Sequence, residues 1–157
     1  MDLNQIQASH SKLSAPCAGA DWLGTLRERA LKSFESSGFP STRQERWKYT
    51  STKALQQLSF AVEAGRGLGA SDIAAHTLEA AAVELVFVNG SYRSDLSRAQ
   101  EGLEVEVLAF GRALESHGGI MESILGSLAT FEGEPDRSFT ALNTAFVGDG
   151  ALVHVRR

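Results

Sequence analysis

One short stretch of the chain gathers the residue types that could do chemistry. Residues 38–58, GFPSTRQERWKYTSTKALQQL, hold one of the two tryptophans and one of the two tyrosines within a cluster of charged side chains. Tryptophan and tyrosine bind ligands when exposed and fix the path of the chain when buried. The stretch could therefore be an enzymatic or redox site that binds a flavin or a nucleotide. The side chains of that site would be Arg43, Glu45, Trp47, Lys48 and Tyr49.

The same stretch also has a purely structural interpretation. Gly38 suits the left-handed position just after a helix, and Pro40 prevents the helix from continuing. Thr42 and Glu45 have the spacing of a capping box, in which each side chain accepts a hydrogen bond from a backbone N–H of the other residue. On this interpretation Trp47 and Tyr49 are packing anchors, and we prefer it.

Cysteine and histidine give little support for a metal or cluster site. Iron–sulfur clusters are held by several thiolates, sometimes with histidine, and Cys17 is the only cysteine. The four histidines lack the spacing of metal ligands along the chain. We expect no catalytic, cofactor-binding or metal-binding residues in this chain, and we expect its histidines to be surface or edge residues: His10, His76, His117 and His154.

Other catalytic signatures are absent from the sequence. There is no Ser-His-Asp arrangement and no pair of carboxylates with catalytic spacing. Residues 65–69, GRGLG, lack the lysine of a phosphate-binding loop, so they are interpreted as a flexible connection. We therefore predict that the chain is not an enzyme.

Composition narrows the class of protein. The chain has 157 residues and a formal net charge of −4, which argues against binding to nucleic acid. No apolar run reaches the roughly 20 residues needed to cross a bilayer, and no secretory signal begins the sequence. A single cysteine excludes an internal disulfide. These features predict a cytoplasmic protein.

Periodicity predicts an α+β fold with a mostly helical first part. Residues 1–20 are interpreted as an unordered lead-in. A helix capped by Asp21 follows, with an apolar stripe through Trp22, Leu23, Leu26, Ala30 and Phe34, and with Arg27 facing water. Asn89 and Gly90 predict a type I′ turn between two short strands, because this dipeptide tolerates two successive positive φ angles.

The second half of the chain predicts a strand over 103–108, with alternating apolar and acidic residues. A helix over 120–128 has Ile120, Ile124 and Leu128 in one apolar row, and Asp136 caps a helix that runs to Phe146. Residues 151–155 form a last strand. Because the chain stops directly after this strand, whose edge would lie unpaired, we expect it to be a piece of a longer protein.

Three motifs together resemble one known family. They are GFPSTRQERWKYTSTKAL at 38–55, LVFVNGSY at 85–92 and FTALNTAFVGDGALVHV at 139–155. In this order they closely resemble the N-terminal region of the SufB/SufD family of the SUF iron–sulfur cluster assembly system, and the first motif is closer to SufD than to SufB. The motif residues, interpreted as structural, are Gly38, Pro40, Thr42, Glu45, Trp47, Lys48, Tyr49, Asn89, Gly90, Leu142, Asn143, Phe146 and Gly150.

The resemblance implies a domain organisation and a set of partners. It implies a lead-in at 1–20, an N-terminal domain at 21–147, and the first strand of a right-handed parallel β-helix at 148–157. It also implies a scaffold that assembles with SufB and with the ATPase SufC, on which iron–sulfur clusters form. SufC would dock on a C-terminal segment that this chain lacks. The resemblance assigns no cluster or ATP to these residues, and it leaves open whether the protein is a homodimer.

Overall fold

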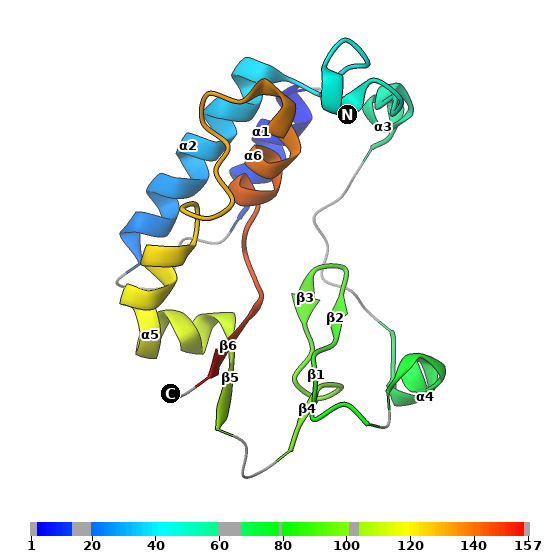
Figure 1. Ribbon diagram of the computed structural model, residues 1–157, viewed down its shortest axis with the longest axis vertical. Coiled ribbons are helices and arrows are strands. Elements are labelled where there is room, and N and C mark those ends of the chain that lie inside the picture. Colours follow the sequence, from blue (N-terminus) through cyan, green and yellow to red (C-terminus); the bar gives the residue numbers. More distant parts are fainter. Residues whose placement is uncertain (1–2, 14–19, 60–66, 79, 101–103, 156–157) are drawn as a thin grey trace. The chain divides into compact units, whose positions relative to one another are not determined.

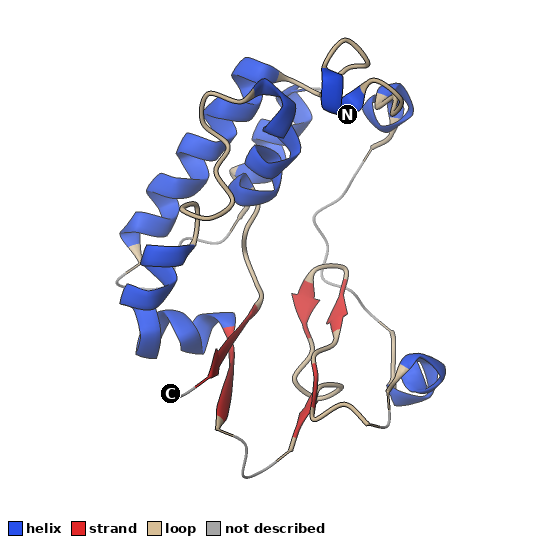
Figure 2. Cartoon of the chain, viewed as in Figure 1, coloured by secondary structure: helices blue, strands red, loops and turns tan. Residues whose placement is uncertain are grey.

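The computed structural model describes residues 3–13, 20–59, 67–78, 80–100 and 104–155 (Figure 1). The chain divides into two compact units, each built from two separate segments. One comprises Met1–Val62 and Gly118–Gly148, and the other comprises Glu63–His117 and Asp149–Arg157. Figure 2 shows helices together with short strands, and the described strands all belong to the second unit, which also contains short helical segments. This confirms the predicted α+β class. The predicted domain boundaries and the β-helix stay predictions.

Two helices form the core of the helical unit. Helix α2 (Asp21–Ser37) packs along α6 (Ser138–Ala145), although they lie about a hundred residues apart in the sequence (Figure 1). Four of the five residues of the predicted stripe on α2 are buried, and the fifth, Trp22, is half-buried. The stripe meets the small residues Ala141 and Ala145 of α6, both fully buried. Small residues on one helix let the other approach closely, so its larger side chains fill the space between them.

The ends of α2 follow local signals, with two corrections. Gly38 has φ of 64°, and its N–H donates to the carbonyl of Phe34, so the predicted helix stop is confirmed. Asp21 is the first helical residue rather than the cap, which is Ala20. Arg27 was predicted to face water and is instead buried. Its Nε donates to the carbonyl of Val147 at 2.7 Å, so the guanidinium satisfies a carbonyl just beyond the end of α6.

The predicted unordered lead-in is wrong for part of its length. Residues Leu3–His10 form helix α1, and its Ile6 is fully buried. The sequence here is rich in polar residues, so one apolar side chain gave no periodic pattern. Packing of that side chain against the rest of the unit outweighs the weak local propensity. Cys17 lies outside the described residues.

The last residue of α1 gives the helical unit a pH dependence. The ring of His10 lies edge-on to Phe146, with 5.8 Å between the ring centres. Burial, and then the nearby charge of Arg27, lower the pKa of His10 below its ordinary value of 6.5. As the pH falls below 6.5, the unfolded chain takes up a proton that the folded chain binds only at a lower pH. The contribution of His10 to stability is therefore present at neutral pH and is lost on acidification.

We expect a His10→Gln variant to lose less stability than the wild-type chain between about pH 7.5 and about pH 5.5. Thermal unfolding at both pH values measures this difference. His76→Gln is the control, because His76 is exposed in the other unit. An equal drop in melting temperature for the wild-type chain and His10→Gln would contradict the assignment.

The second unit contains three antiparallel strand pairs. Strand β1 (Val83–Glu84) pairs with β4 (Arg98–Ala99), and β2 (Phe87–Val88) pairs with β3 (Ser91–Tyr92). The predicted turn between β2 and β3 is confirmed: Asn89 has φ of 50° and Gly90 has φ of 83°. The turn is local, so its two residues determine the pairing of the hairpin.

The longest strand pair joins distant parts of the sequence. Strand β5 (Val105–Ala109) lies antiparallel to β6 (Ala151–Val155), with Glu106 opposite His154 (Figure 1). The predicted strands are confirmed over these residues, whereas Leu103 lies outside the described residues. Strand β6 pairs with β5 along one edge.

Helix α5 (Phe110–Ile124) follows β5 directly and is kinked at His117, where φ is −131°. The break predicted at the Gly118–Gly119 pair thus falls one residue earlier. The predicted apolar row is wrong, because Ile120, Ile124 and Leu128 are exposed and the neighbouring Met121 is buried. Helical periodicity identified the apolar side of this segment. The kink at His117 changes the direction of the helix, and periodicity alone does not show which apolar residues then face the core.

Short helical segments complete the chain. The structure has the 3₁₀ segments Glu45–Trp47, Ala74–His76 and Pro135–Arg137, and the helices α3 (Lys53–Gln57) and α4 (Ala70–Ile73). Among the described residues, no helix is long and apolar enough to cross a membrane.

Candidate functional site

A run of four aromatic rings connects the first motif to the core of the helical unit. It begins at Phe34 near the end of α2, continues through Phe39 to Phe139 in the first turn of α6, and ends on Trp47. Successive ring centres are 5.2, 5.9 and 5.2 Å apart, and each pair is edge-to-face. This geometry is favourable because the positive edge of one ring meets the negative face of the next. Residues 39 and 47 of the first motif thus contact residue 139 of the third.

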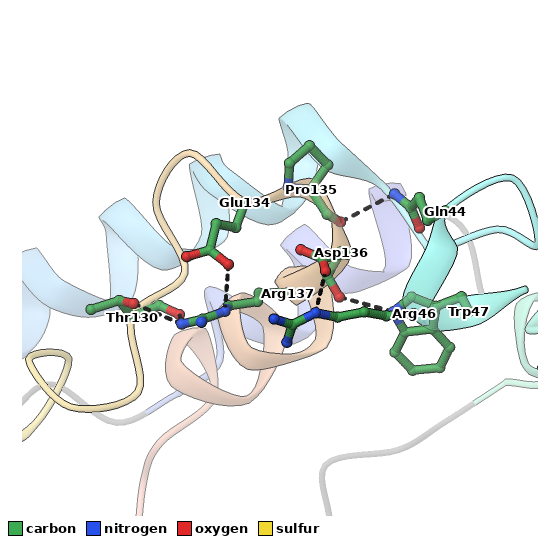
Figure 3. Close-up of polar contacts among 8 residues, drawn as sticks. All are labelled: Gln44, Arg46, Trp47, Thr130, Glu134, Pro135, Asp136 and Arg137. Atoms are coloured by element: carbon green, nitrogen blue, oxygen red, sulfur yellow. Dashed lines mark hydrogen bonds and ion pairs between the residues drawn. The ribbon is translucent and has the colours of Figure 1, made fainter.

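The polar atom of Trp47 also has a partner inside the protein. Its indole N–H donates to the backbone carbonyl of Asp136 at 2.8 Å (Figure 3). The side chain is half-buried, with one edge on Phe139. A tryptophan whose ring and N–H are both engaged holds two segments of chain together. Trp47 thus makes the contacts expected of a packing anchor.

Charged groups around Trp47 pair with one another across the same two segments. Arg46 lies 2.8 Å from the carboxylate of Asp136, and the amide of Gln44 donates to the carbonyl of Pro135 at 3.3 Å (Figure 3). Arg137 contacts Glu134 at 2.7 Å and donates to Thr130. Asp136 was predicted to cap α6, but the cap position belongs to Arg137. Instead, the carboxylate of Asp136 pairs with Arg46, and its backbone carbonyl accepts the hydrogen bond from the indole N–H of Trp47.

The capping box predicted in the first motif does not form, and neighbouring side chains close a turn there instead. The structure shows no side-chain cap made by Thr42 for the 3₁₀ segment that begins at Glu45, and both side chains are exposed. Instead, the N–H of Ser41 donates to the side-chain carbonyl of Gln44 at 3.0 Å, and the N–H of Arg43 donates to the hydroxyl of Ser41 at 3.4 Å. Ser41 and Gln44 also have the capping-box spacing. The sequence therefore contains two overlapping residue pairs with this spacing.

An open cleft of about 440 Å³ lies beside Trp47. Two arginines line it, and both already contact carboxylates of the protein, Arg46 with Asp136 and Arg137 with Glu134. A phosphate or a flavin would have to compete with these partly exposed ion pairs, each of which contributes only about 0–1 kcal/mol. The cleft is lined by Arg46, Trp47, Thr50, Ala129, Thr130, Asp136, Arg137, Phe139 and Thr140.

The remaining residues of the proposed ligand-binding cluster do not converge on this cleft. Tyr49 is 91 % exposed, so the prediction that it is a packing anchor is wrong. The amino group of Lys48 lies 5.5 Å from the centre of that ring, an exposed cation–π contact. Arg43 and Glu45 are exposed and do not line the cleft. Of the five residues proposed to bind a flavin or a nucleotide, the structure places Trp47 alone in the wall.

The other motif residues have structural positions. Pro40 is fully buried, and its carbonyl accepts a hydrogen bond of 2.7 Å from the buried hydroxyl of Thr52. Leu142 and Asn143 lie in α6, and Phe146 is its C-cap. In the other unit, the carbonyl of Gly150 accepts a hydrogen bond from the N–H of Phe110 at 2.9 Å. Asn89 and Gly90 form the β2–β3 turn described above.

Sequence reasoning missed the partners of the first motif. Asp136 and Phe139 carry no local signal for a contact about ninety residues upstream in the chain, since pairing between distant segments depends on the tertiary fold. The Pro-Asp-Arg sequence at 135–137 indicated only a loop before a helix. The first motif and the start of the third, at Phe139, nevertheless pack together within the helical unit.

A comparison with protein families identifies the chain. A family model described as the SufBD protein N-terminal region matches residues 8–157, which is nearly the whole chain. The chain belongs to the SufBD family. The SufBD family is a family of scaffold proteins of iron–sulfur cluster assembly. The match spans both units of the structure. No curated protein matches the chain.

Proposed function

We propose that this chain is the N-terminal region of a SufD-like protein that acts without catalysis in the complex of SufB, SufC and SufD. The match to the SufBD N-terminal region over residues 8–157 carries this proposal. The choice of SufD over SufB rests on the first motif, residues 38–55, which is closer to SufD. The cofactors of the process, an iron–sulfur cluster and ATP on SufC, belong to the rest of the complex.

The geometry around Trp47 supports a structural or interaction role. The side chains that could have bound a flavin or a nucleotide either pair with the helical unit or lie exposed outside the cleft. A motif used in this way fixes the fold of the N-terminal region. A catalytic site requires a nucleophile, an acid or a base directed at an open position. The paired side chains around Trp47 supply no such arrangement.

Deletion of this region from the longer protein tests the proposal. We expect the full-length protein to co-purify with SufB and SufC. The protein that lacks this region should still bind SufC, and it should recover less SufB or assemble less cluster. SufB captured on tagged SufC, together with iron and sulfide per complex, measures the effect. The Tyr49→Ala full-length protein is the control, because Tyr49 is exposed.

Three outcomes would overturn the proposal. Normal SufB binding and cluster assembly by the deleted protein would show that the region acts elsewhere. If the full-length protein binds SufD and SufC and replaces SufB in the complex, the chain is the corresponding region of SufB. Turnover of a flavin or nucleotide substrate by the purified chain would contradict the non-catalytic role.

A further inference from the structure

Three side chains that could ligate a metal converge in the β-containing unit, outside the site described above. They are Glu106 on β5, His154 on β6 and His117 at the kink of α5. Their ligand atoms all lie within 4.8 Å of one another. Two imidazoles with one carboxylate form a donor set that binds first-row divalent metals, as in zinc and non-haem iron(II) sites.

The fold brings these residues together in two ways. Glu106 and His154 are directly opposite in the antiparallel register of β5 and β6, so their side chains share one face of the ribbon. His117 comes from the helix that begins immediately after β5, and its backbone leaves helical geometry at that residue. Its ring lies edge-on to the ring of His154, with 5.3 Å between the centres.

The spacing suits an ion better than direct hydrogen bonds. Oε2 of Glu106 lies 3.6 Å from Nε2 of His117 and 3.9 Å from Nδ1 of His154. Both distances are too long for good hydrogen bonds. Donor atoms about 2.1 Å from a tetrahedral metal lie about 3.4 Å from one another, so small movements of the side chains would complete the site.

One of the three donor atoms lacks any other use in the described part of the chain. Nδ1 of His154 is buried, and no hydrogen-bond partner for it is found among the described residues. A buried polar nitrogen without a partner costs roughly 1–3 kcal/mol, and a bound cation would recover this cost. Such atoms are uncommon in proteins, and this one faces a carboxylate and a second imidazole.

The other histidine is oriented by a neighbouring hydroxyl. Oγ of Ser116 donates to the carbonyl of Arg112 at 2.8 Å and lies 2.8 Å from Nδ1 of His117. A hydroxyl that donates to that carbonyl can accept from Nδ1–H of the imidazole. In that tautomer Nε2, the atom that faces Glu106, has its lone pair available to a metal. Support of this kind, from the second ring nitrogen of a histidine ligand, is usual in metal sites.

We propose that Glu106, His117 and His154 bind one first-row divalent transition-metal ion, with at least one coordination position left for water or another donor. The expectation from sequence was that the four histidines bind no metal, because their spacing along the chain showed no pattern. The pairing of β5 with β6 supplies the proximity that the spacing could not show. The proposal does not depend on the function proposed above, since it rests on these side chains alone.

Titration of the metal-free chain with Zn²⁺ and with Co²⁺ at about pH 7.5 tests the site. A Cys17→Ser background removes the only thiol, so any binding must come from other ligands. We expect one equivalent of Zn²⁺ by calorimetry, and visible ligand-field bands of bound Co²⁺. His154→Ala and Glu106→Gln should each weaken binding at least about 100-fold, and Ser116→Ala about 10-fold.

His76→Ala is the matched control, since it removes an exposed histidine from the same unit. The isosteric Glu106→Gln change separates loss of a ligand from loss of the fold, with circular dichroism reporting on the fold of every variant. Zn²⁺ binding that persists in the His117→Ala/His154→Ala double variant would overturn the proposal. So would the absence of saturable binding in the parent chain, or an equal loss of binding in His76→Ala.

Discussion

Replacing Phe34 by alanine is expected to lower the free energy of unfolding by about 3–5 kcal/mol. Phe34 is fully buried on α2, and its ring begins the aromatic run that continues to Phe39. Removal of the ring leaves a cavity between α2 and α6 and also removes an edge-to-face contact. Thermal and denaturant unfolding measure the loss, with a fall in melting temperature on the order of 10 °C.

Lys32→Ala is the control for this change, because Lys32 is exposed on the same helix and alanine favours helix. We expect its stability to stay within about 0.5 kcal/mol of the parent chain. A Phe34→Ala variant that loses less than about 1 kcal/mol would show that this ring is not part of the core in solution.

The elements predicted well are those with signals inside a few residues. The apolar stripe of α2 and its stop at Gly38 are confirmed, as is the Asn89–Gly90 turn. Each depends on contacts or backbone angles within one helical turn or one hairpin. Side-chain period and positive φ are then sufficient for a prediction.

The errors occur where several local solutions compete. Thr42 with Glu45 and Ser41 with Gln44 satisfy the same capping-box spacing, and the side chains of the second pair bond to the backbone of a turn. The side chain of Gln44 also donates to the carbonyl of Pro135. This contact joins the two segments of the helical unit, so no local sequence pattern signals it.

Contacts between distant segments could not be predicted from the sequence. The burial of Arg27 depends on a carbonyl at Val147, and the nearness of Glu106 to His154 depends on the register of β5 and β6. No residue near either partner in the sequence signals the other. The family resemblance indicated which segments matter, whereas the structure shows which of their atoms meet.

Trp47→Ala is expected to destabilise the helical unit by about 2–4 kcal/mol. The change removes the edge contact with Phe139 and leaves the carbonyl of Asp136 without its indole donor. The estimate is below that for a fully buried tryptophan because Trp47 is half-buried. Trp47→Phe retains a ring and loses the N–H, so it should cost about 1 kcal/mol.

Tyr49→Ala is the matched control, since it removes an aromatic ring two residues away that is 91 % exposed. Its stability should change by no more than about 0.5 kcal/mol. Thermal unfolding of all three variants, with and without flavin mononucleotide or ATP, separates an anchor from a binding site. An anchor predicts graded losses of stability and no ligand-dependent shift in the parent chain. A saturable shift that disappears in folded Trp47→Ala and persists in Tyr49→Ala would instead make the cleft beside Trp47 a ligand site, because the ring would then be needed for binding beyond its role in the fold.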